Sequence, residues 1–381
     1  MSFLPRVVLL LACFVVLSAP ASQAETYDLP ARAAILIDDT TGQILFEKNA
    51  DEALPPASMS KLMTAYMVFS RLKEGSLSLD DTFPVSEKAW RKGGSKMFVE
   101  VNTRVKISDL LRGIIIQSGN DACIVVAEGI GGTEDNFATM MTDTAKEIGL
   151  RDSTFRNASG WPDPDHLMSV RDLALLARTI IHEFPQYYDI YGEKDFEYNG
   201  IVQYSRNPLL QRNVPGVDGL KTGYTDEAGY GLVASAEREG RRLIMVIAGL
   251  ESANARSQEG ERLLEYGYRH FNAYRLFTAG ETVENASVWL GDATSVPLVP
   301  KRDVVVSLSR EARRDLEVKL VYDGPIPAPI DAGTEIAKLQ ISVPNQPSFD
   351  VPLTAGETVD AASLVGRARS ALSYLIWGPT S

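Results

Sequence analysis

Cysteine, histidine and positive charge are all scarce in this 381-residue chain, and each scarcity argues against a class of site. The three histidines, His166, His182 and His270, stand far apart without HExxH or CxxC spacing, so we expect no metal site and no cofactor. Lys and Arg total 38 against 50 Asp and Glu, a net charge of −12. No basic stripe is present to neutralise phosphates, and we therefore expect no nucleic-acid partner.

The first 24 residues have the pattern of a cleaved secretory signal. Arg6 is a short positive region, Val7 to Leu17 form an apolar core, and Ser22-Gln23-Ala24 is a small-x-small cleavage site. The apolar run is too short to span a bilayer comfortably. Cleavage would remove Cys13 and leave Cys123 as the single cysteine, so the exported chain would depend on its core rather than on a disulfide.

The length predicts two domains, of which the first is expected to cover residues 25–277. Residues 33–48 alternate around a Thr41-Gly42 turn, which indicates a hairpin. Helices are predicted from residue 58 to about Gly75, over 107–130 with a break at 118–120, and at 135–149, 169–183 and 256–271. Antiparallel strands are predicted at 216–224, 229–236 and 242–250. Helices between an early hairpin and late strands favour an α/β sandwich with both chain ends in one sheet.

After about residue 277 the composition changes to short Val-rich runs, such as 303–308 and 316–322, between Gly, Pro and Asp clusters. This pattern predicts a small all-β domain over 278–358. Helical spacing returns at 359–381, where Ala361, Leu364, Val365, Ala368, Ala371, Leu372, Leu375 and Ile376 fall on one arc. Basic margins and aromatic ends suit a helix lying in a membrane interface, although the same stripe could pack on the β domain.

The segment Ser58-Met59-Ser60-Lys61 follows two prolines and opens the first predicted helix. A hydroxyl and an amine one turn apart on the same face can be a nucleophile and its base. Ser70 and Lys73 repeat the spacing, but at a predicted helix end, where solvated side chains are the simpler interpretation. The motif needs partners before it indicates a site.

Two further motifs supply those partners. Ser118-Gly119-Asn120 interrupts an apolar helical region, although 205–207 and 252–254 also match SxN and a helix N-cap is its ordinary interpretation. Lys221-Thr222-Gly223 is the only KTG in the chain and lies on a predicted strand, where Gly223 would let a substrate backbone approach closely. SxxK, SxN and KTG in this order are typical of penicillin-binding proteins and class A β-lactamases.

In these motifs and their flanking residues the chain resembles the low-molecular-weight penicillin-binding proteins, which are serine-type D-alanyl-D-alanine carboxypeptidases. The resemblance is carried by residues 58–61, 116–123 and 217–223. The resemblance covers nearly the whole chain. It implies a β-lactamase/transpeptidase-like α/β sandwich with an antiparallel sheet, a small C-terminal all-β domain and a terminal amphipathic helix. It also implies removal of the terminal D-alanine from peptidoglycan stem pentapeptides, acylation by penicillins, and a location on the periplasmic face of the inner membrane.

The resemblance assigns roles to individual residues. Ser58 would be the acylated nucleophile, Lys61 its base, Ser118 a proton donor to the leaving amine, and Asn120 a group that holds the substrate amide and orients Lys61. Lys221, Thr222 and Gly223 would bind the terminal carboxylate and the substrate backbone, and the N–H groups of Ser58 and Tyr224 would be oxyanion donors. Tyr224 departs from the family, in which many members have His. Arg206 and Arg256 are lesser candidates for the carboxylate, and a solvated or structural role is an equal alternative.

Other functions remain open from the sequence. A DD-endopeptidase would use the same site, as would a β-lactamase, but residues 157–168 contain no Glu to serve as the deacylating base of a class A enzyme. A non-catalytic penicillin sensor or cell-wall binder should tolerate loss of Ser58 or Lys61. The 157–166 loop would border the site in this family, or be a surface loop held by its prolines. Cys123 is read as a small buried hydrophobe.

Overall fold

The computed structural model describes residues 27–343, 348–363 and 366. Its first domain is built on an antiparallel sheet with the strand order β2-β1-β9-β8-β7. The strands are β1 (Ala33–Asp38), β2 (Ile44–Lys48), β7 (Val217–Thr225), β8 (Gly229–Arg238) and β9 (Arg241–Leu250). Because β1 pairs with β9 along its whole length, both ends of the domain meet in one sheet, as the sequence predicted.

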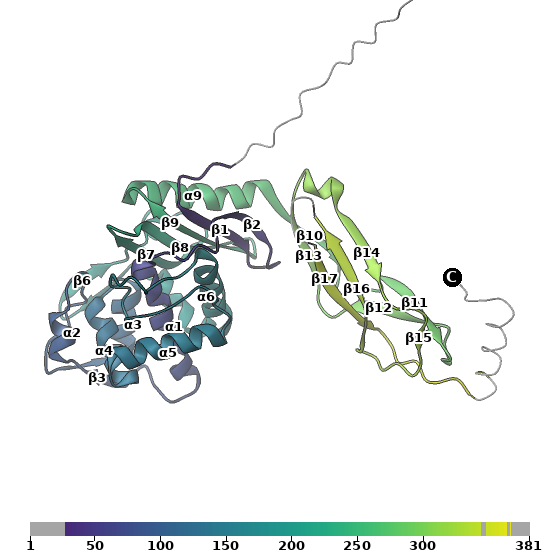
Figure 1. Ribbon diagram of the computed structural model, residues 1–381, viewed down its shortest axis with the longest axis horizontal. Helices are drawn as coiled ribbons and strands as arrows, with labels where there is room; N and C mark the ends of the chain where they lie inside the picture. Colours follow the sequence, from purple (N-terminus) through teal and green to yellow (C-terminus); the bar gives the residue numbers. More distant parts are fainter. Residues whose placement is uncertain (1–26, 344–347, 364–365, 367–381) are drawn as a thin grey trace, which may run out of the picture. The chain divides into compact units, whose positions relative to one another are not determined.

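Helices cover both faces of this sheet (Figure 1). Helix α9 (Ala253–His270) lies against β8 and β9, and α6 (Val170–Glu183) packs against β1 and β9 from the opposite face. The central strands are therefore mainly apolar in their middle parts, and residues 232–234 and 243–247 have no exposed surface. β7 is at the edge of the sheet, so its KTG segment is left beside the helical layer.

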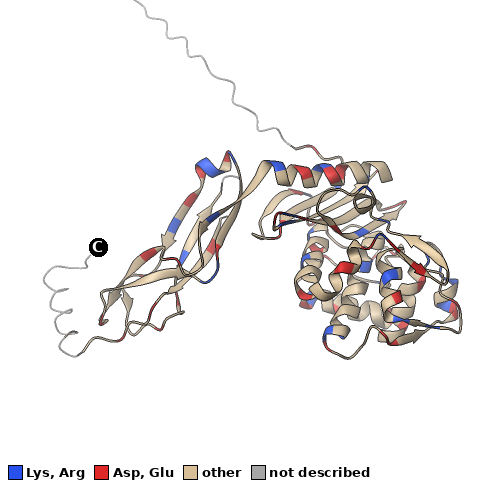
Figure 2. Cartoon of the chain, turned by 180° about the vertical axis from the view of Figure 1, so that it is seen from behind, with Lys and Arg blue, Asp and Glu red and all other residues tan. Residues whose placement is uncertain are grey.

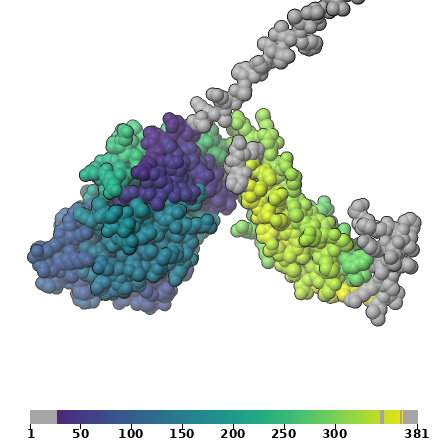
Figure 3. Space-filling model, viewed as in Figure 1, coloured from purple at the N-terminus to yellow at the C-terminus, as the bar shows by residue number. Residues whose placement is uncertain are grey.

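The helical layer has α1 (Lys61–Lys73) at its centre. Helices α3 (Ile107–Ile115), α4 (Asn120–Gly131), α5 (Glu134–Glu147) and α6 pack against it, and α2 (Glu87–Arg91) packs against α4. In the space-filling view the blue-to-teal part of the chain, to which these helices belong, forms one continuous surface (Figure 3). Leu62, Met63, Val68 and Phe69 of α1 are completely buried, so this helix is held by packing on all sides. The predicted break at 118–120 is confirmed, because α3 ends before it and α4 begins at Asn120.

One helix boundary differs from the prediction. Ser58 was expected in the first turn of α1, but it lies in a separate 3-10 turn, η1 (Ala57–Ser60), and α1 begins at Lys61. Ala57 has a φ of +48°, which a helix cannot accommodate, so regular α geometry starts only beyond it. A tightened turn of this kind is common at helix N-termini.

Smaller elements complete the domain. They are β3 (Thr82–Pro84), β4 (Arg104–Lys106), α7 (Pro185–Tyr188), η2 (Asp189–Gly192), β5 (Asp195–Tyr198), β6 (Ile201–Tyr204) and α8 (Pro208–Gln211). β3 pairs with β4, and β5 with β6, as two-stranded antiparallel sheets. The mixture of helices and an antiparallel sheet is the α/β class that the sequence predicted.

The C-terminal domain is β-rich, also as predicted. Its elements are β10 (Phe271–Phe277), β11 (Glu284–Trp289), β12 (Ser295–Pro300), β13 (Val304–Ser309), η3 (Ala312–Asp315), β14 (Glu317–Val321), β15 (Ile326–Pro327), β16 (Glu335–Ser342) and β17 (Phe349–Ala355). A six-stranded sheet with the order β14-β16-β17-β12-β11-β15 encloses an apolar core that includes Val296, Leu298, Ile341 and Leu353. β10 pairs with β13, so this strand, which precedes residue 277, belongs with the β-rich domain.

The start of the predicted terminal helix is extended instead. Ala361 forms a bridge with Gly291, and the N–H of Ala362 donates to the carbonyl of Leu290. Residues 360–362 therefore belong to the β-rich domain. The predicted helix beyond them lies largely outside the described residues, and so does the predicted signal at 1–24. Within the described ranges, we find no helix with the length and apolar character needed to cross a bilayer. Basic and acidic residues are interspersed over the described chain (Figure 2).

Candidate active site

The ammonium nitrogen of Lys61 is the point at which three separate segments meet. Its Nζ lies 2.8 Å from Oγ of Ser58 in η1, 2.8 Å from Oδ1 of Asn120 at the start of α4, and 2.6 Å from the carbonyl oxygen of Ser159. Lys61 is only 1% exposed. The predicted SxxK and SxN motifs are therefore in direct contact through one buried amine.

Two buried lysines lie in this region without a carboxylate partner among the described residues. Burial lowers the pKa of Lys61 to about 8, and the positive charge of Lys92 acts in the same direction. Lys221 is 2% exposed, and burial, followed by the charge of Lys61, holds its pKa well below the ordinary value. Amines in such surroundings can give up a proton near neutral pH, which is uncommon for lysine.

The SxN segment is shaped by backbone geometry and by a neighbouring carboxylate. Ser118 has a φ of +66°, and Gly119 is the N-cap residue of α4. Asn120 uses both ends of its amide, because its Oδ1 accepts from Lys61 while its Nδ2 donates to the carbonyl of Gly93 at 2.9 Å. Its orientation is thereby determined on both sides.

Asp121, which the sequence pattern did not single out, binds the backbone of residues 97–99. Its buried carboxylate accepts the backbone N–H groups of Met97 at 2.9 Å, Phe98 at 2.9 Å and Val99 at 3.2 Å. Charge-assisted bonds to three successive amides fix the irregular 97–99 segment, in which Phe98 has a φ of +68°. The Asp that directly follows SxN was the only sequence signal for this role.

Gly223 of the KTG motif permits a close approach by the protein's own backbone. A Cβ at this position would lie 2.8 Å from the carbonyl oxygen of Pro56 and 3.2 Å from the backbone nitrogen of Met59. The sequence suggested that Gly223 makes room for a substrate; the structure shows that it makes room for η1. Lys221 and Thr222 are buried beside it, and the Nζ of Lys221 donates to the carbonyl of Thr222 at 3.2 Å.

The 157–166 loop reaches the site and is not merely a surface loop. The carboxamide oxygen of Asn157 accepts the N–H groups of Ser159 and Trp161, which shapes the turn that presents the carbonyl of Ser159 to Lys61. A Cβ at Gly160 would lie 1.9 Å from the carbonyl oxygen of Ala57, so only glycine fits there. A backbone carbonyl has no sequence signature, and the contribution of Ser159 was missed for this reason.

The two arginines and Tyr224 lie around Lys221. The charges of Arg206 and Arg256 both contribute to the lowered pKa of Lys221. Nε of Arg206 donates to Oε1 of Gln117 at 3.4 Å, and Arg256 donates to the carbonyl of Gly223 at 3.5 Å. No ion pair joins either arginine to a carboxylate in the described part of the chain. Tyr224 is 47% exposed.

The remaining candidates offer no reactive group to the site. Lys73, of the second SxxK match, pairs with Glu183 at 3.2 Å on the exposed end of α1. Cys123 is completely buried, as expected of a small hydrophobe, and burial raises the pKa of its thiol to about 12. His166 is also buried, and burial lowers its pKa to about 4.

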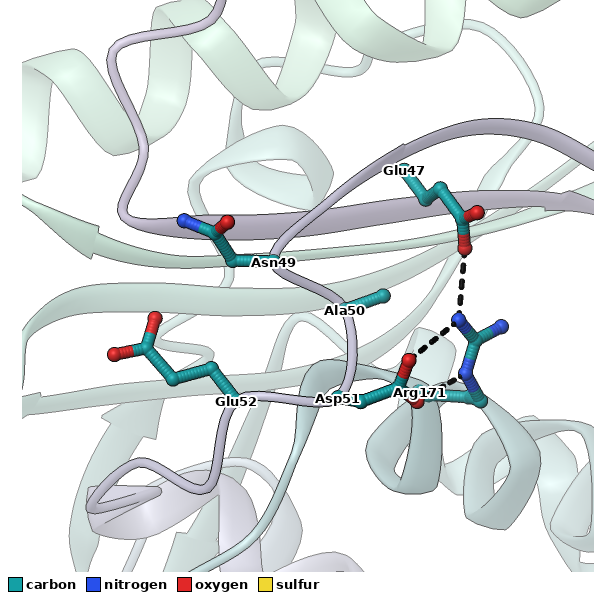
Figure 4. A pocket seen from close by; sticks show the side chains of 6 residues that line it. All are labelled: Glu47, Asn49, Ala50, Asp51, Glu52 and Arg171. Carbon is teal, nitrogen blue, oxygen red and sulfur yellow. Dashed lines mark hydrogen bonds and ion pairs between the residues drawn. The ribbon is translucent and has the colours of Figure 1, made fainter.

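A shallow hollow of about 640 Å³ lies elsewhere on the first domain, lined by Glu47, Asn49, Ala50, Asp51, Glu52 and Arg171 (Figure 4). Its charges are already paired. Arg171 contacts both Glu47 and Asp51, and Glu52 contacts Arg32. The hollow offers no nucleophile and no unpaired cation, so the chemistry is expected at Ser58 and Lys61 instead.

Comparison with known proteins agrees with this fold and geometry. The family described as D-alanyl-D-alanine carboxypeptidase (peptidase S11) matches residues 19–252, and that described as penicillin-binding protein 5, C-terminal domain, matches residues 271–361. D-alanyl-D-alanine carboxypeptidase DacC of Escherichia coli is 36% identical over 368 residues, covering 93% of this chain and 92% of the relative. DacA of the same organism is 34% identical and covers 89% of this chain and 86% of its own.

Solved structures give the same result. Penicillin-binding protein 5 from Haemophilus influenzae has a TM-score of 0.80 and 35% identity, covering 87% of this chain and 98% of its own. Penicillin-binding protein D2 from Listeria monocytogenes, in its ampicillin-bound form, has a TM-score of 0.58 and 31% identity, covering 63% of this chain and 98% of its own.

Fold and motifs thus define a serine-type acyl-transfer enzyme of the penicillin-binding class. The chain belongs to the peptidase S11 family of D-alanyl-D-alanine carboxypeptidases. It is a D-Ala-D-Ala carboxypeptidase with the C-terminal β-rich domain of the penicillin-binding protein 5 type, and it acts in peptidoglycan metabolism. Peptidoglycan peptides are the substrates of this family, and the Listeria monocytogenes relative was solved with ampicillin bound.

Proposed function

We propose that Ser58 is the nucleophile of the carboxypeptidase reaction and that Lys61 is its base. Oγ of Ser58 attacks the carbonyl carbon of the penultimate D-alanine, the bond to the terminal D-alanine breaks, and water then hydrolyses the resulting ester. The observation that carries the proposal is the 2.8 Å contact between Oγ of Ser58 and the buried Nζ of Lys61. A β-lactam carbonyl would be attacked in the same way.

The surroundings of Lys61 suit a neutral amine. A neutral amine has two N–H donors and one lone pair. The Oδ1 of Asn120 and the carbonyl oxygen of Ser159 are acceptors, so they accept the two N–H groups of the amine. The lone pair of Nζ is then directed at the hydroxyl of Ser58. Lys61 can therefore accept the proton of Ser58 as the ester forms, and Ser118 can pass a proton on to the leaving amine.

The terminal carboxylate of the substrate is assigned to the cations around the KTG strand. Lys221 and Arg256 lie there without a carboxylate partner among the described residues, and Arg206 bonds only a neutral amide. A carboxylate bound there would favour the charged form of Lys221 and would compensate the charges of Arg206 and Arg256. Thr222 completes the carboxylate site, and the N–H groups of Ser58 and Tyr224 serve as oxyanion donors, as the family resemblance implies.

The side chain of Tyr224 takes no part in proton transfer in this scheme. Its hydroxyl donates to Oδ1 of Asp226 at 2.5 Å, and this hydrogen bond raises the pKa of Tyr224 to about 12. The phenol therefore stays neutral, with its proton directed at Asp226. The backbone N–H of Tyr224 is unaffected by this substitution for His.

The assignment is tested with Ser58→Ala and with Ser60→Ala as its matched control. Ser60 lies in the same turn, and its buried hydroxyl has no hydrogen-bond partner among the described residues, so removing it should leave the fold intact. Ser58→Ala should lose both D-alanine release from a pentapeptide and covalent labelling by fluorescent penicillin, while Ser60→Ala retains both. Label retained by folded Ser58→Ala would refute the assignment.

We also propose that the chain is exported by its first 24 residues and held at the periplasmic face of the inner membrane by its C-terminal segment. The support is the pattern of the sequence, with apolar residues on one arc and Arg367 and Arg369 at its margins. Because Ala361 and Ala362 pair with the β-rich domain, the test is truncation after Gly366 rather than at 360. Truncation should move the protein from the membrane fraction to the soluble fraction, and an unchanged distribution would contradict the proposal.

A further inference from the structure

Two tyrosines stack at the end of the KTG strand. Tyr224 on β7 and Tyr230 on β8 are directly opposite in the register of the sheet. Their ring centroids are 4.1 Å apart with an interplanar angle of 29°, a stacked arrangement. Cross-strand aromatic pairs of this kind stabilise each other's rotamers.

The second ring of the pair lies beneath an arginine. The guanidinium carbon of Arg256, in the first turn of α9, is 5.5 Å from the ring centroid of Tyr230, within the range of a cation–π contact. Tyr224, Tyr230 and Arg256 therefore form a continuous series of contacts that ends at the carbonyl of Gly223, where Arg256 donates its 3.5 Å hydrogen bond.

Little else in the described chain fixes the guanidinium of Arg256. Its Nε is buried without a hydrogen-bond partner, and no carboxylate pairs with it among the described residues. Burial lowers the pKa of Arg256, in agreement with a cation whose charge is poorly compensated. The long bond to Gly223 is weak, so the aromatic face of Tyr230 is the main contact that defines where the guanidinium lies.

We propose that Tyr230, supported by the stacked ring of Tyr224, is a positioning residue that holds Arg256 ready for the terminal carboxylate of the substrate. The inference rests on the proposed role of Arg256 in binding that carboxylate. It gives Tyr224 a function through its ring alone, because its hydroxyl is engaged by Asp226. In this chain an aromatic stack takes the position where many family members have His.

The first test compares Tyr230→Ala, Tyr230→Phe and Arg256→Ala on two matched peptides, one ending in D-Ala-D-Ala and one ending in D-Ala-D-alaninamide. Tyr230→Ala should raise KM for the free acid about fivefold with kcat nearly unchanged. Tyr230→Phe, which keeps the ring, should resemble the unaltered protein. The amide lacks the carboxylate, so its kcat/KM should be the same in Tyr230→Ala, Tyr230→Phe and the unaltered protein.

A double variant separates positioning from general damage. If Tyr230 acts through Arg256, Tyr230→Ala combined with Arg256→Ala should have the KM of Arg256→Ala alone. Additive increases, or an equal loss on the amide peptide, would overturn the proposal. An unchanged KM in Arg256→Ala would instead refute the proposed carboxylate role of Arg256. The fraction of protein labelled by saturating fluorescent penicillin confirms in each case that the site is folded.

The contribution of Tyr224 is tested with Tyr224→Phe and Tyr224→Ala. Phe retains the stacked ring and removes only the bond to Asp226, so KM for the free acid should stay within about twofold of the original value. Ala removes the stack and should raise that KM in the same direction as Tyr230→Ala. The reverse order, with Phe impaired and Ala unaffected, would contradict a role for the ring.

Discussion

The Nζ of Lys61 lies 2.8 Å from the Oγ of Ser58, and the two residues are joined by a 3-10 turn rather than by an α-helix. In a 3-10 turn there are three residues per turn, so side chains three positions apart eclipse one another. In an α-helix the same pair would be offset around the axis. The tight turn of η1 thus favours the contact on which the proposed chemistry depends.

The rate of acylation should depend on pH through Lys61. The pKa of Lys61 is lowered to about 8, and only its neutral form can accept the proton of Ser58. Below pH 8 the rate constant for labelling by fluorescent penicillin should rise roughly tenfold per pH unit and level off above about pH 9. Lys61→Arg, which keeps a permanent charge, should show no labelling at any pH. A flat profile between pH 6 and 8 would be inconsistent with Lys61 as the base.

Replacing Gly160 by Ala should damage both the fold and the site. The new Cβ would lie 1.9 Å from the carbonyl oxygen of Ala57, so the loop or η1 must move. Gly200 is the matched control, since its φ is also +72° but a Cβ added there would meet nothing within 4 Å. Gly200→Ala should cost about 1 kcal/mol of unfolding free energy from backbone strain alone. Gly160→Ala should cost roughly 3 kcal/mol or more and slow penicillin labelling. Urea denaturation measures both, and equal losses would contradict the contact.

Asp121→Asn should loosen the segment beside the SxN motif. The carboxylate accepts three backbone N–H groups, and an amide would accept fewer and turn donors toward them. We expect a loss of roughly 2–4 kcal/mol in the free energy of unfolding, with slower acylation of Ser58. Asp135→Asn, at an exposed position in the first turn of α5, should cost less than about 1 kcal/mol. Similar losses in the two variants would argue against a special role for Asp121.

Cys123 should be inert in the folded protein. It is completely buried, and its pKa is raised to about 12, so almost no thiolate exists at neutral pH. A thiol reagent such as DTNB should therefore react only after denaturation. Rapid reaction of a folded chain that lacks residues 1–24 would show that the interior around α4 opens easily.

The sequence predicted what depends on periodicity and motif order. Alternation at 33–48 and apolar runs at 229–236 and 242–250 indicated the strands of the sheet. The order of the SxxK, SxN and KTG motifs predicted one site, and Ser58, Lys61 and Asn120 are in contact in the structure. These signals are local, or are carried by the identities of side chains. Such signals can be recognised in a sequence because burial and chemistry both restrict which residue types can occupy these positions.

Features that depend on backbone atoms were not predictable. The carbonyl of Ser159 binds Lys61, but any residue supplies a carbonyl. The 3-10 turn η1 begins at Ala57, whose φ is positive although alanine has no preference for that conformation. Gly223 lies on the KTG strand as predicted, but it was expected to make room for a substrate. The backbone that approaches it closely is that of Pro56 of the same chain.

The three-way contact of Lys61 also has a consequence for when the enzyme becomes reactive. Ser58, Asn120 and Ser159 belong to segments that come together only when α1, α4 and the 157–161 turn are all in place. In an unfolded chain Lys61 is an ordinary solvated cation, and Ser58 is an ordinary alcohol with no base beside it. Reactivity toward β-lactams thus depends on the completed tertiary structure, and Ser58 is expected to be unreactive as long as the chain is unfolded.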